Sequence, residues 1–98
     1  MYEKIANSGL HDYELVSIAV SYSEGEIVIT LRTPENVDES IQISDFASFK
    51  ISHQEPWGRG KYIVFSNLYR IKAGLTLCEM ELNSGDIVQI EFQEGDLR

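Results

Sequence analysis

The stretch that decides the fold spans residues 75–92 and reads LTLCEMELNSGDIVQIEF. Apolar and polar residues alternate in both of its halves. The first half carries three apolar residues on one face: Cys78, Met80 and Leu82. The second half carries three more on one face: Val88, Ile90 and Phe92. Alternation with a period of two on both sides of a polar turn predicts a β-hairpin of two half-buried strands.

The turn of this hairpin follows from the requirement that both apolar sets face the same way. A two-residue turn would pair Met80 with Gln89 and would mix the core and solvent faces. A three-residue loop at Asn83-Ser84-Gly85 instead pairs Met80 with Val88, and it gives the glycine the left-handed position of a type I turn with a bulge. We therefore predict this loop. The outer face of the hairpin then carries Glu79, Glu81, Gln89 and Glu91.

A second pair of strands is predicted at residues 13–22 and 26–33, which also alternate. Facing Val20 with Ile27 requires a loop with an even number of residues. A four-residue loop over 22–25 satisfies this and leaves Gly25 last, where a left-handed backbone is useful. The apolar face of the first of these strands comprises Val16, Ile18 and Val20.

The remaining segments give shorter signals. Strands are predicted at 40–44, at 46–52 and in the first half of 62–69, loops at 33–39 and 53–61, and a turn at Gly74. Residues 1–12 fit either a short helix that ends near Gly9 or an irregular segment. A chain of 98 residues has room for one core. We therefore predict one all-β domain over residues 1–98, a small antiparallel sandwich or barrel of about six or seven strands, with a short N-terminal helix as an option.

Charge and cysteine content restrict the class of protein. The net charge is −8, from 8 basic and 16 acidic residues, which argues against binding to nucleic acid or to an anionic membrane surface. A basic protein partner is compatible with it, and so is acidity that serves solubility alone. The one cysteine, Cys78, cannot form an intramolecular disulfide, and the N-terminus does not read as a secretory signal. We therefore expect a cytoplasmic protein.

The charge is unevenly distributed along the chain. Residues 56–78 contain four basic residues and no acidic one, whereas residues 79–97 contain six acidic residues and no basic one. The domain is strongly dipolar if these segments lie on different faces, and the charges neutralise each other if the segments form adjacent strands. The four basic residues are Arg59, Lys61, Arg70 and Lys72.

The motifs that could carry chemistry lack their essential partners. His11-Asp12 could belong to a metal-dependent phosphohydrolase, but such a site needs further histidines, so we expect Asp12 to cap the first strand and His11 to bond backbone. The segment Gly58-Arg59-Gly60-Lys61 lacks the Ser or Thr and the helix of a phosphate loop. Cys78 lies on an apolar face, where a nucleophile would be inert. We predict no enzyme, no cofactor and no metal site.

Two segments are candidates for binding rather than catalysis. Trp57 lies beside Arg59 in a predicted loop, a composition common in interface hot spots. Trp57 could equally fold back and close the end of a small barrel. Ser84 and Asp86 flank Gly85 in the predicted turn, where bonding between their side chains and the local backbone is sufficient to explain them.

Three separated pieces of the sequence carry a resemblance: Leu10-His11-Asp12, Glu55-Pro56-Trp57-Gly58 and Leu82-Asn83-Ser84-Gly85-Asp86. In order and spacing they resemble a group of small uncharacterised bacterial β domains, some of which are similar to immunity proteins encoded beside polymorphic toxins. The resemblance covers most of the chain and implies a cytoplasmic β domain without known catalysis. It also implies one cluster of His11, Asp12, Trp57 and Asp86.

Three functions follow as hypotheses. The first is a protein-interaction module, most specifically an immunity-type inhibitor of a basic toxin. The second is a small-ligand-binding β domain in which Trp57, Arg59 and His11 line a pocket. The third is a homo-oligomeric subunit that pairs through an open β edge, such as the outer side of the last hairpin.

Overall fold

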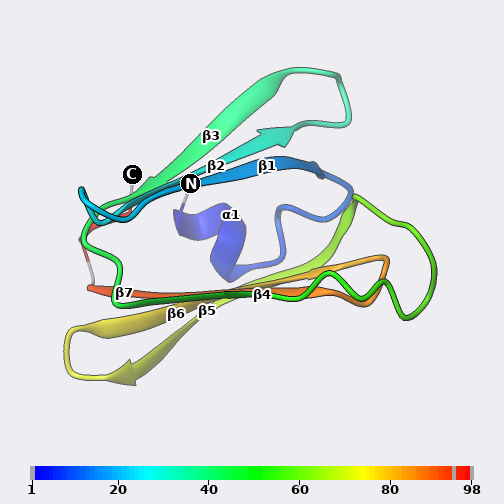
Figure 1. Cartoon of the computed structure of the whole chain (residues 1–98). Helices are drawn as coiled ribbons and strands as arrows, with labels where there is room; N and C mark the ends of the chain where they lie inside the picture. Colours follow the sequence, from blue (N-terminus) through cyan, green and yellow to red (C-terminus); the bar gives the residue numbers. More distant parts are fainter. Residues whose placement is uncertain (1, 94, 98) are drawn as a thin grey trace.

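The computed structural model describes residues 2–93 and 95–97, which form two antiparallel sheets and one short helix (Figure 1). The elements in chain order are α1 (Tyr2–Ala6), β1 (Glu14–Ser21), β2 (Glu26–Arg32), β3 (Asp38–Ile43), β4 (Ser48–Ile51), β5 (Ile63–Lys72), β6 (Leu75–Leu82) and β7 (Ile87–Gln93). The smaller sheet has the order β1-β2-β3 and the larger one the order β4-β7-β6-β5. The predicted all-β class is confirmed, and of the two predicted architectures the fold is a sandwich.

The hairpin of β6 and β7 has the predicted register. Met80 pairs with Val88 and Cys78 pairs with Ile90, and the side chains of all four are fully buried. The three-residue loop is confirmed, since the Leu82 N–H donates to Asp86 O and Gly85 has a φ of +91°. This loop holds both apolar faces on the core side, as the parity of the sequence requires.

The hairpin lies in the middle of the larger sheet, and the open edge predicted on its outer side is therefore wrong. β4 covers the free side of β7 and β5 covers the free side of β6. Both partners come from segments earlier in the chain, so the alternation within the hairpin does not reveal them.

The hairpin of β1 and β2 is also confirmed in register, with Val20 opposite Ile27 and Gly25 at a φ of +66°. The apolar face predicted for β1 is wrong at Val16 and Val20, which are 40% and 44% exposed, whereas Ile18 packs against the core. At Val16, a β-bulge between Leu15 and Ser17 breaks the alternation. Bulges re-aim side chains in this way and cannot be read from alternation.

Three strand boundaries differ from those predicted. β3 begins at Asp38, two residues before the predicted start, because the loop before it closes early through the Thr33 N–H and Val37 O. β4 is shorter than predicted because Asp45, at a φ of +50°, turns the chain and the Phe46 N–H donates to Gly25 O. β5 is longer than predicted because β6 supplies partners along its whole length.

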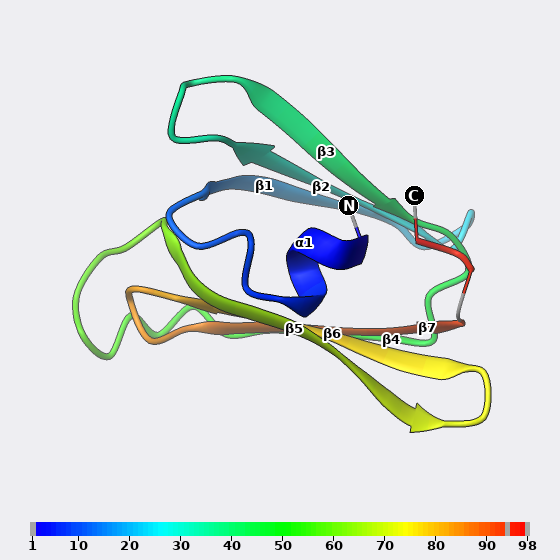
Figure 2. The same cartoon turned by 180° about the vertical axis from the view of Figure 1, so that it is seen from behind.

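The N-terminal segment adopts the helical alternative. In Figure 2, α1 lies in the space between the two sheets, above β5. Ile5 and Leu10 are fully buried there, and the Gly9 N–H ends the helix by donating to Lys4 O. The Ser66 hydroxyl on β5 donates to Ile5 O at 3.0 Å, which ties the helix to the larger sheet.

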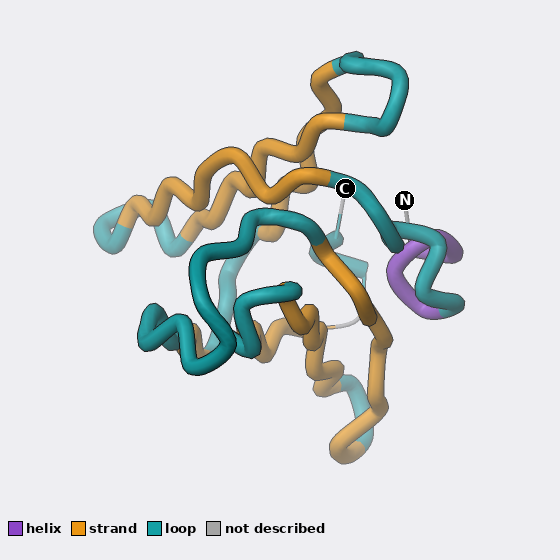
Figure 3. The backbone as a smooth tube through the Cα atoms, turned by 90° about the vertical axis from the view of Figure 1, so that its right-hand side faces the viewer, coloured by secondary structure: helices purple, strands orange, loops and turns teal. Residues whose placement is uncertain are grey.

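The starts of β1 and β5 join the two sheets at a corner. The Leu15 N–H donates to Lys61 O and the Ile63 N–H donates to Tyr13 O, so the start of β1 continues onto the start of β5. Figure 3 shows the long teal loop, residues 52–62, at the open end of the sandwich beside this corner. Within the described residues, no helix is long and apolar enough to cross a membrane.

The basic segment is partly neutralised. Lys61 lies 3.5 Å from the Glu14 carboxylate. Arg70 and Lys72 lie on β5, adjacent to β6, but they lie opposite Thr76 and Leu75, whereas Glu79 and Glu81 lie opposite Asn67 and Phe65. The two segments therefore form adjacent strands at β5 and β6 with their charges at different positions along the pair, and Arg59 lies in the loop between β4 and β5.

Candidate functional site

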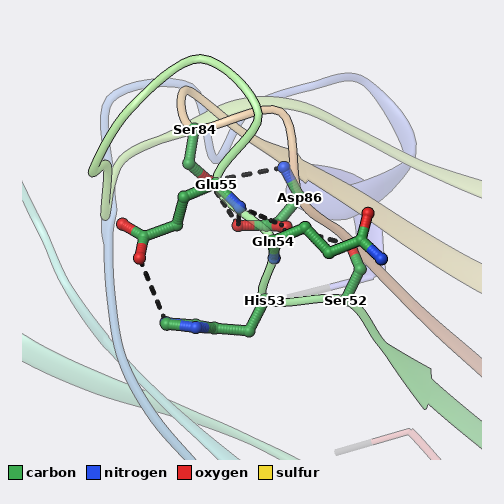
Figure 4. Close-up of polar contacts among 6 residues, drawn as sticks. All are labelled: Ser52, His53, Gln54, Glu55, Ser84 and Asp86. Atoms are coloured by element: carbon green, nitrogen blue, oxygen red, sulfur yellow. Dashed lines mark hydrogen bonds and ion pairs between the residues drawn. The ribbon is translucent and has the colours of Figure 1, made fainter.

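The carboxylate of Asp86 organises the loop after β4. Asp86 is 2% exposed and follows the β6–β7 turn directly. Its Oδ1 accepts hydrogen bonds from the Gln54 N–H at 2.7 Å and from the Ser52 hydroxyl at 3.2 Å. Its Oδ2 accepts from the Glu55 N–H at 3.1 Å and from the Ser84 hydroxyl at 2.9 Å (Figure 4). Two consecutive backbone N–H groups that point at one carboxylate form a small anion-binding concavity.

The two serines are themselves held in place. The Ser84 hydroxyl oxygen accepts from the Asp86 N–H at 3.3 Å, and the Ser52 hydroxyl oxygen accepts from the Ile87 N–H at 3.0 Å. The local bonding predicted for Ser84 and Asp86 is therefore present. The network extends further than predicted, because the remaining partners of Asp86 lie 31 to 34 residues earlier in the chain.

The hydrogen bonds decide the ionisation of Asp86. Desolvation by burial raises the pKa of this carboxyl, but the Gln54 N–H, the hydroxyls of Ser84 and Ser52 and the Glu55 N–H together lower it below its ordinary value. Asp86 is consequently a carboxylate at neutral pH. With its oxygens committed to the loop, it is a structural clamp rather than a general acid.

The clamp presents Trp57 to solvent. The backbone N–H of Trp57 donates to the backbone oxygen of Ser84 at 3.1 Å. The backbone N–H of Gly58 donates to the oxygen of Glu55 and closes a turn. The indole lies against Gly85, where a β-carbon would approach Trp57 Cε3 to 3.1 Å. The ring is nevertheless 73% exposed, so the alternative in which it closes the end of the barrel is wrong.

A concave site of about 480 Å³ lies beside this loop. It is lined by His53, Glu55, Arg59, Gly60, Lys61, Tyr62 and Asn83. The predicted pocket included Trp57, Arg59 and His11, and of these only Arg59 is in the lining. The volume falls within the range of about 300–1,000 Å³ that small-molecule sites occupy.

His11 and Asp12 form a separate pair on the surface. Nδ1 of His11 lies 3.2 Å from Oδ2 of Asp12, and both side chains are more than half exposed. The backbone of Asp12, at a φ of 71°, donates its N–H to Ile63 O at the entry to β1. The sequence predicted that His11 would bond to backbone; in the described residues its imidazole contacts the Asp12 carboxylate instead.

The cluster implied by the resemblance is only partly formed. Trp57 and Asp86 are brought together on the two sides of Gly85. Among the described residues, no polar contact joins His11 or Asp12 to either of them.

Within residues 2–93 and 95–97 no group of three or more His, Cys, Asp or Glu side chains could hold a metal ion. The thiol of Cys78 is fully buried, and desolvation, with a smaller contribution from Glu79, raises its pKa to about 12. A thiol with that pKa supplies almost no thiolate at neutral pH.

Several residues of the site carry no signal in the sequence. Ser52 and the backbone of residues 54 and 55 become partners of Asp86 only through the pairing of β4 with β7. The loop between β4 and β5 folds onto the β6–β7 turn. This fold brings three further side chains into the lining of the concave site: His53, Lys61 and Asn83. Lys61 lies in the Gly58-Arg59-Gly60-Lys61 segment and Asn83 lies in the predicted turn, but neither pattern predicts a cavity. A β-carbon at Gly60 would approach the Ser84 nitrogen to 2.6 Å, so this glycine is required for packing.

No protein-family model matches the chain, and no curated protein matches it either.

Proposed function

We propose that the chain is a protein-interaction module, most specifically a cytoplasmic immunity-type inhibitor that binds a basic toxin and has no enzymatic activity. The observation that carries the proposal is the exposed Trp57 on a loop held by a buried carboxylate. A large apolar ring costs free energy when it is left in water, and burial against a partner recovers it.

The geometry of the loop favours recognition. Interface hot spots are enriched in Trp, Arg and Tyr, and this loop exposes Trp57, Arg59 and Tyr62 within six residues. The bonds from Asp86 to residues 54 and 55 fix the loop before any partner binds. A pre-organised loop loses less conformational entropy on association than a mobile one.

The charge of the chain supports a basic partner. Opposite net charge speeds encounter and selects against wrong partners, and this chain carries −8. Three carboxylates lie on the outer face of β6 and β7, the strands joined by the turn beneath Trp57: Glu79, Glu81 and Glu91. Within the described part of the chain they form no ion pair; Glu79 accepts from Gln89 and Glu91 accepts from Ser48. We propose that this acidic row meets basic side chains of the partner.

The resemblance supports the same function. Two of its three motifs, Glu55-Pro56-Trp57-Gly58 and Leu82-Asn83-Ser84-Gly85-Asp86, are the segments that meet at the clamp. In this proposal the motifs recur because together they build the surface that presents the indole.

Binding to the product of the adjacent gene tests the proposal. We expect a complex tighter than micromolar with the full chain, and we expect Trp57→Ala to weaken it about 30-fold or more. Tyr22→Ala is the matched control, because Tyr22 is 93% exposed in the β1–β2 turn and should leave the affinity unchanged. An affinity weaker than micromolar, or equal losses from the two variants, would contradict the proposal.

A further inference from the structure

A second cavity adjoins the one beside the loop. It has a volume of about 500 Å³ and lies between β1 and β4. It shares His53, Gly60 and Lys61 with the first cavity, so the two cavities lie side by side along this segment. The two adjoining cavities together are called the groove below.

The second cavity is apolar because two edge strands face each other without pairing. β1 and β4 are each at an edge of their sheet. Ile18, Phe49 and Leu82 line the cavity, and all three pack in or against the core. Val16, Val20 and Ile51 line it while remaining 40–46% exposed. On the opposite side, where α1 lies, Ile5 and Leu10 provide the corresponding apolar cover.

The first cavity differs from the second in its charged side chains. It is lined by the cationic side chains of Arg59 and Lys61 and by His53, whose Nε2 lies 3.9 Å from the one carboxylate in the lining, that of Glu55. This is a local excess of positive charge in a chain with twice as many acidic as basic residues. Within the described residues the Arg59 guanidinium has no ion-pair or hydrogen-bond partner. Lys61 remains 58% exposed despite its 3.5 Å contact with Glu14.

The donors of this cavity are held in place. Asn83 Oδ1 accepts the Tyr62 N–H at 3.1 Å, and the Asn83 N–H donates to Tyr62 O at 2.8 Å. This bond fixes the orientation of the Asn83 side chain, and within the described residues its NH₂ group makes no hydrogen bond. Gly60 packs directly on this asparagine. The unused NH₂ group favours a ligand that accepts hydrogen bonds.

From this arrangement we propose that the groove binds a free single-chain amphiphilic anion, such as a medium-chain fatty acid. The carboxylate lies between Arg59 and Lys61 and accepts from the Asn83 NH₂. The alkyl chain lies along Ile18, Phe49 and Leu82, between the edges of β1 and β4. Bonds from cationic donors to a carboxylate are about twice as strong as neutral ones, and each methylene removed from water adds to the affinity.

Titration of the full chain with sodium hexanoate, octanoate and decanoate tests this site. Each ligand is kept below its micelle concentration at constant ionic strength, and binding is followed by calorimetry. We expect the affinity to rise about two- to fourfold per methylene, because full burial of a CH₂ group corresponds to about fourfold. 1-Octanol should bind more weakly than octanoate, since it lacks the charged head.

Two variants separate the two ends of the ligand. Arg59→Gln should lower octanoate affinity about tenfold and leave 1-octanol affinity unchanged. Ile51→Ser should lower the affinity for both. Lys72→Gln is the matched control for charge, because Lys72 lies at the far end of β5 and should have no effect. Equal losses in Arg59→Gln and Lys72→Gln, no dependence on chain length, or binding to anionic vesicles without binding to free octanoate would each overturn the proposal.

Discussion

The Asp86 carboxylate and the backbone N–H of Gln54 meet at 2.7 Å across 32 residues of sequence. This bond connects the end of the β6–β7 turn to the loop that exposes Trp57. The exposed indole of Trp57 is therefore positioned by the buried carboxylate of Asp86. The connection makes the shape of the loop depend on the stability of the hairpin, and the following predictions test that dependence.

Removal of the clamp should loosen the loop and destabilise the fold. Asp86→Ala leaves the N–H groups of residues 54 and 55 and two hydroxyls without their acceptor. We expect the midpoint of thermal unfolding to fall by on the order of 10 °C. The emission of Trp57, the only tryptophan, should also become more readily quenched by iodide. Glu35→Ala, at an exposed acidic residue in the loop before β3, should leave the quenching unchanged. Unchanged quenching in Asp86→Ala would show that the loop holds its shape without the clamp.

The clamp should also make stability dependent on pH in the acid range. The pKa of Asp86 is lowered in the folded state, so the unfolded chain takes up the proton first as the pH falls. The stabilisation is fully present above the ordinary carboxyl pKa of 3.8 and is lost as the pH falls through the lower folded value. Asp86→Asn lacks this contribution. Urea unfolding between pH 5 and pH 2.5 should therefore show a shallower loss of stability in Asp86→Asn than in the natural chain; parallel curves would rule out this linkage.

The contact between Gly85 and Trp57 can be tested with two glycine variants. Gly85 and Gly58 have φ values of +91° and +92°, so an alanine at either position suffers the same backbone strain. A β-carbon at Gly85 would in addition approach Pro56 Cγ to 2.7 Å, whereas one at Gly58 meets nothing within 4 Å. We expect Gly58→Ala to cost about 1 kcal/mol of unfolding free energy and Gly85→Ala to cost about 1–3 kcal/mol more. Only Gly85→Ala should shift the emission maximum of Trp57, and equal effects would argue against the contact.

The thiol of Cys78 should be unreactive in the folded protein. Burial raises its pKa to about 12, and no solvent reaches it. We expect no reaction with a thiol reagent such as DTNB at pH 8 in buffer, and complete reaction of one thiol per chain in denaturing urea. Because the pKa is raised in the folded state, this group should also lower stability as the pH rises above about 9. Rapid labelling without denaturant would mean that β6 opens locally.

Much of this structure follows from local alternation. The register of β6 with β7 and that of β1 with β2 were both predicted from parity and from one glycine each, Gly85 and Gly25. These predictions hold because a shift of one residue would turn an entire apolar face toward water, which is a large cost over a single hairpin. The burial of Cys78 and Met80 follows from the same argument.

The positions of the strands in the sheets and the surroundings of the loop depend on contacts between distant segments. The alternation of β6 and β7 is the same at the edge of a sheet as at its centre, so the sequence could not show that β4 and β5 cover this hairpin. The bulge that exposes Val16 and the full length of β5 have the same origin in strand pairing.

For the candidate site, the sequence by itself determined the residue types: a lone tryptophan beside an arginine, and an aspartate after a tight turn. Only the tertiary structure decided that Trp57 is exposed and that Asp86 holds its loop, because the N–H groups that satisfy the buried carboxylate come from residues more than 30 positions away. A buried charge must find such partners, and chain folding alone brings them within reach.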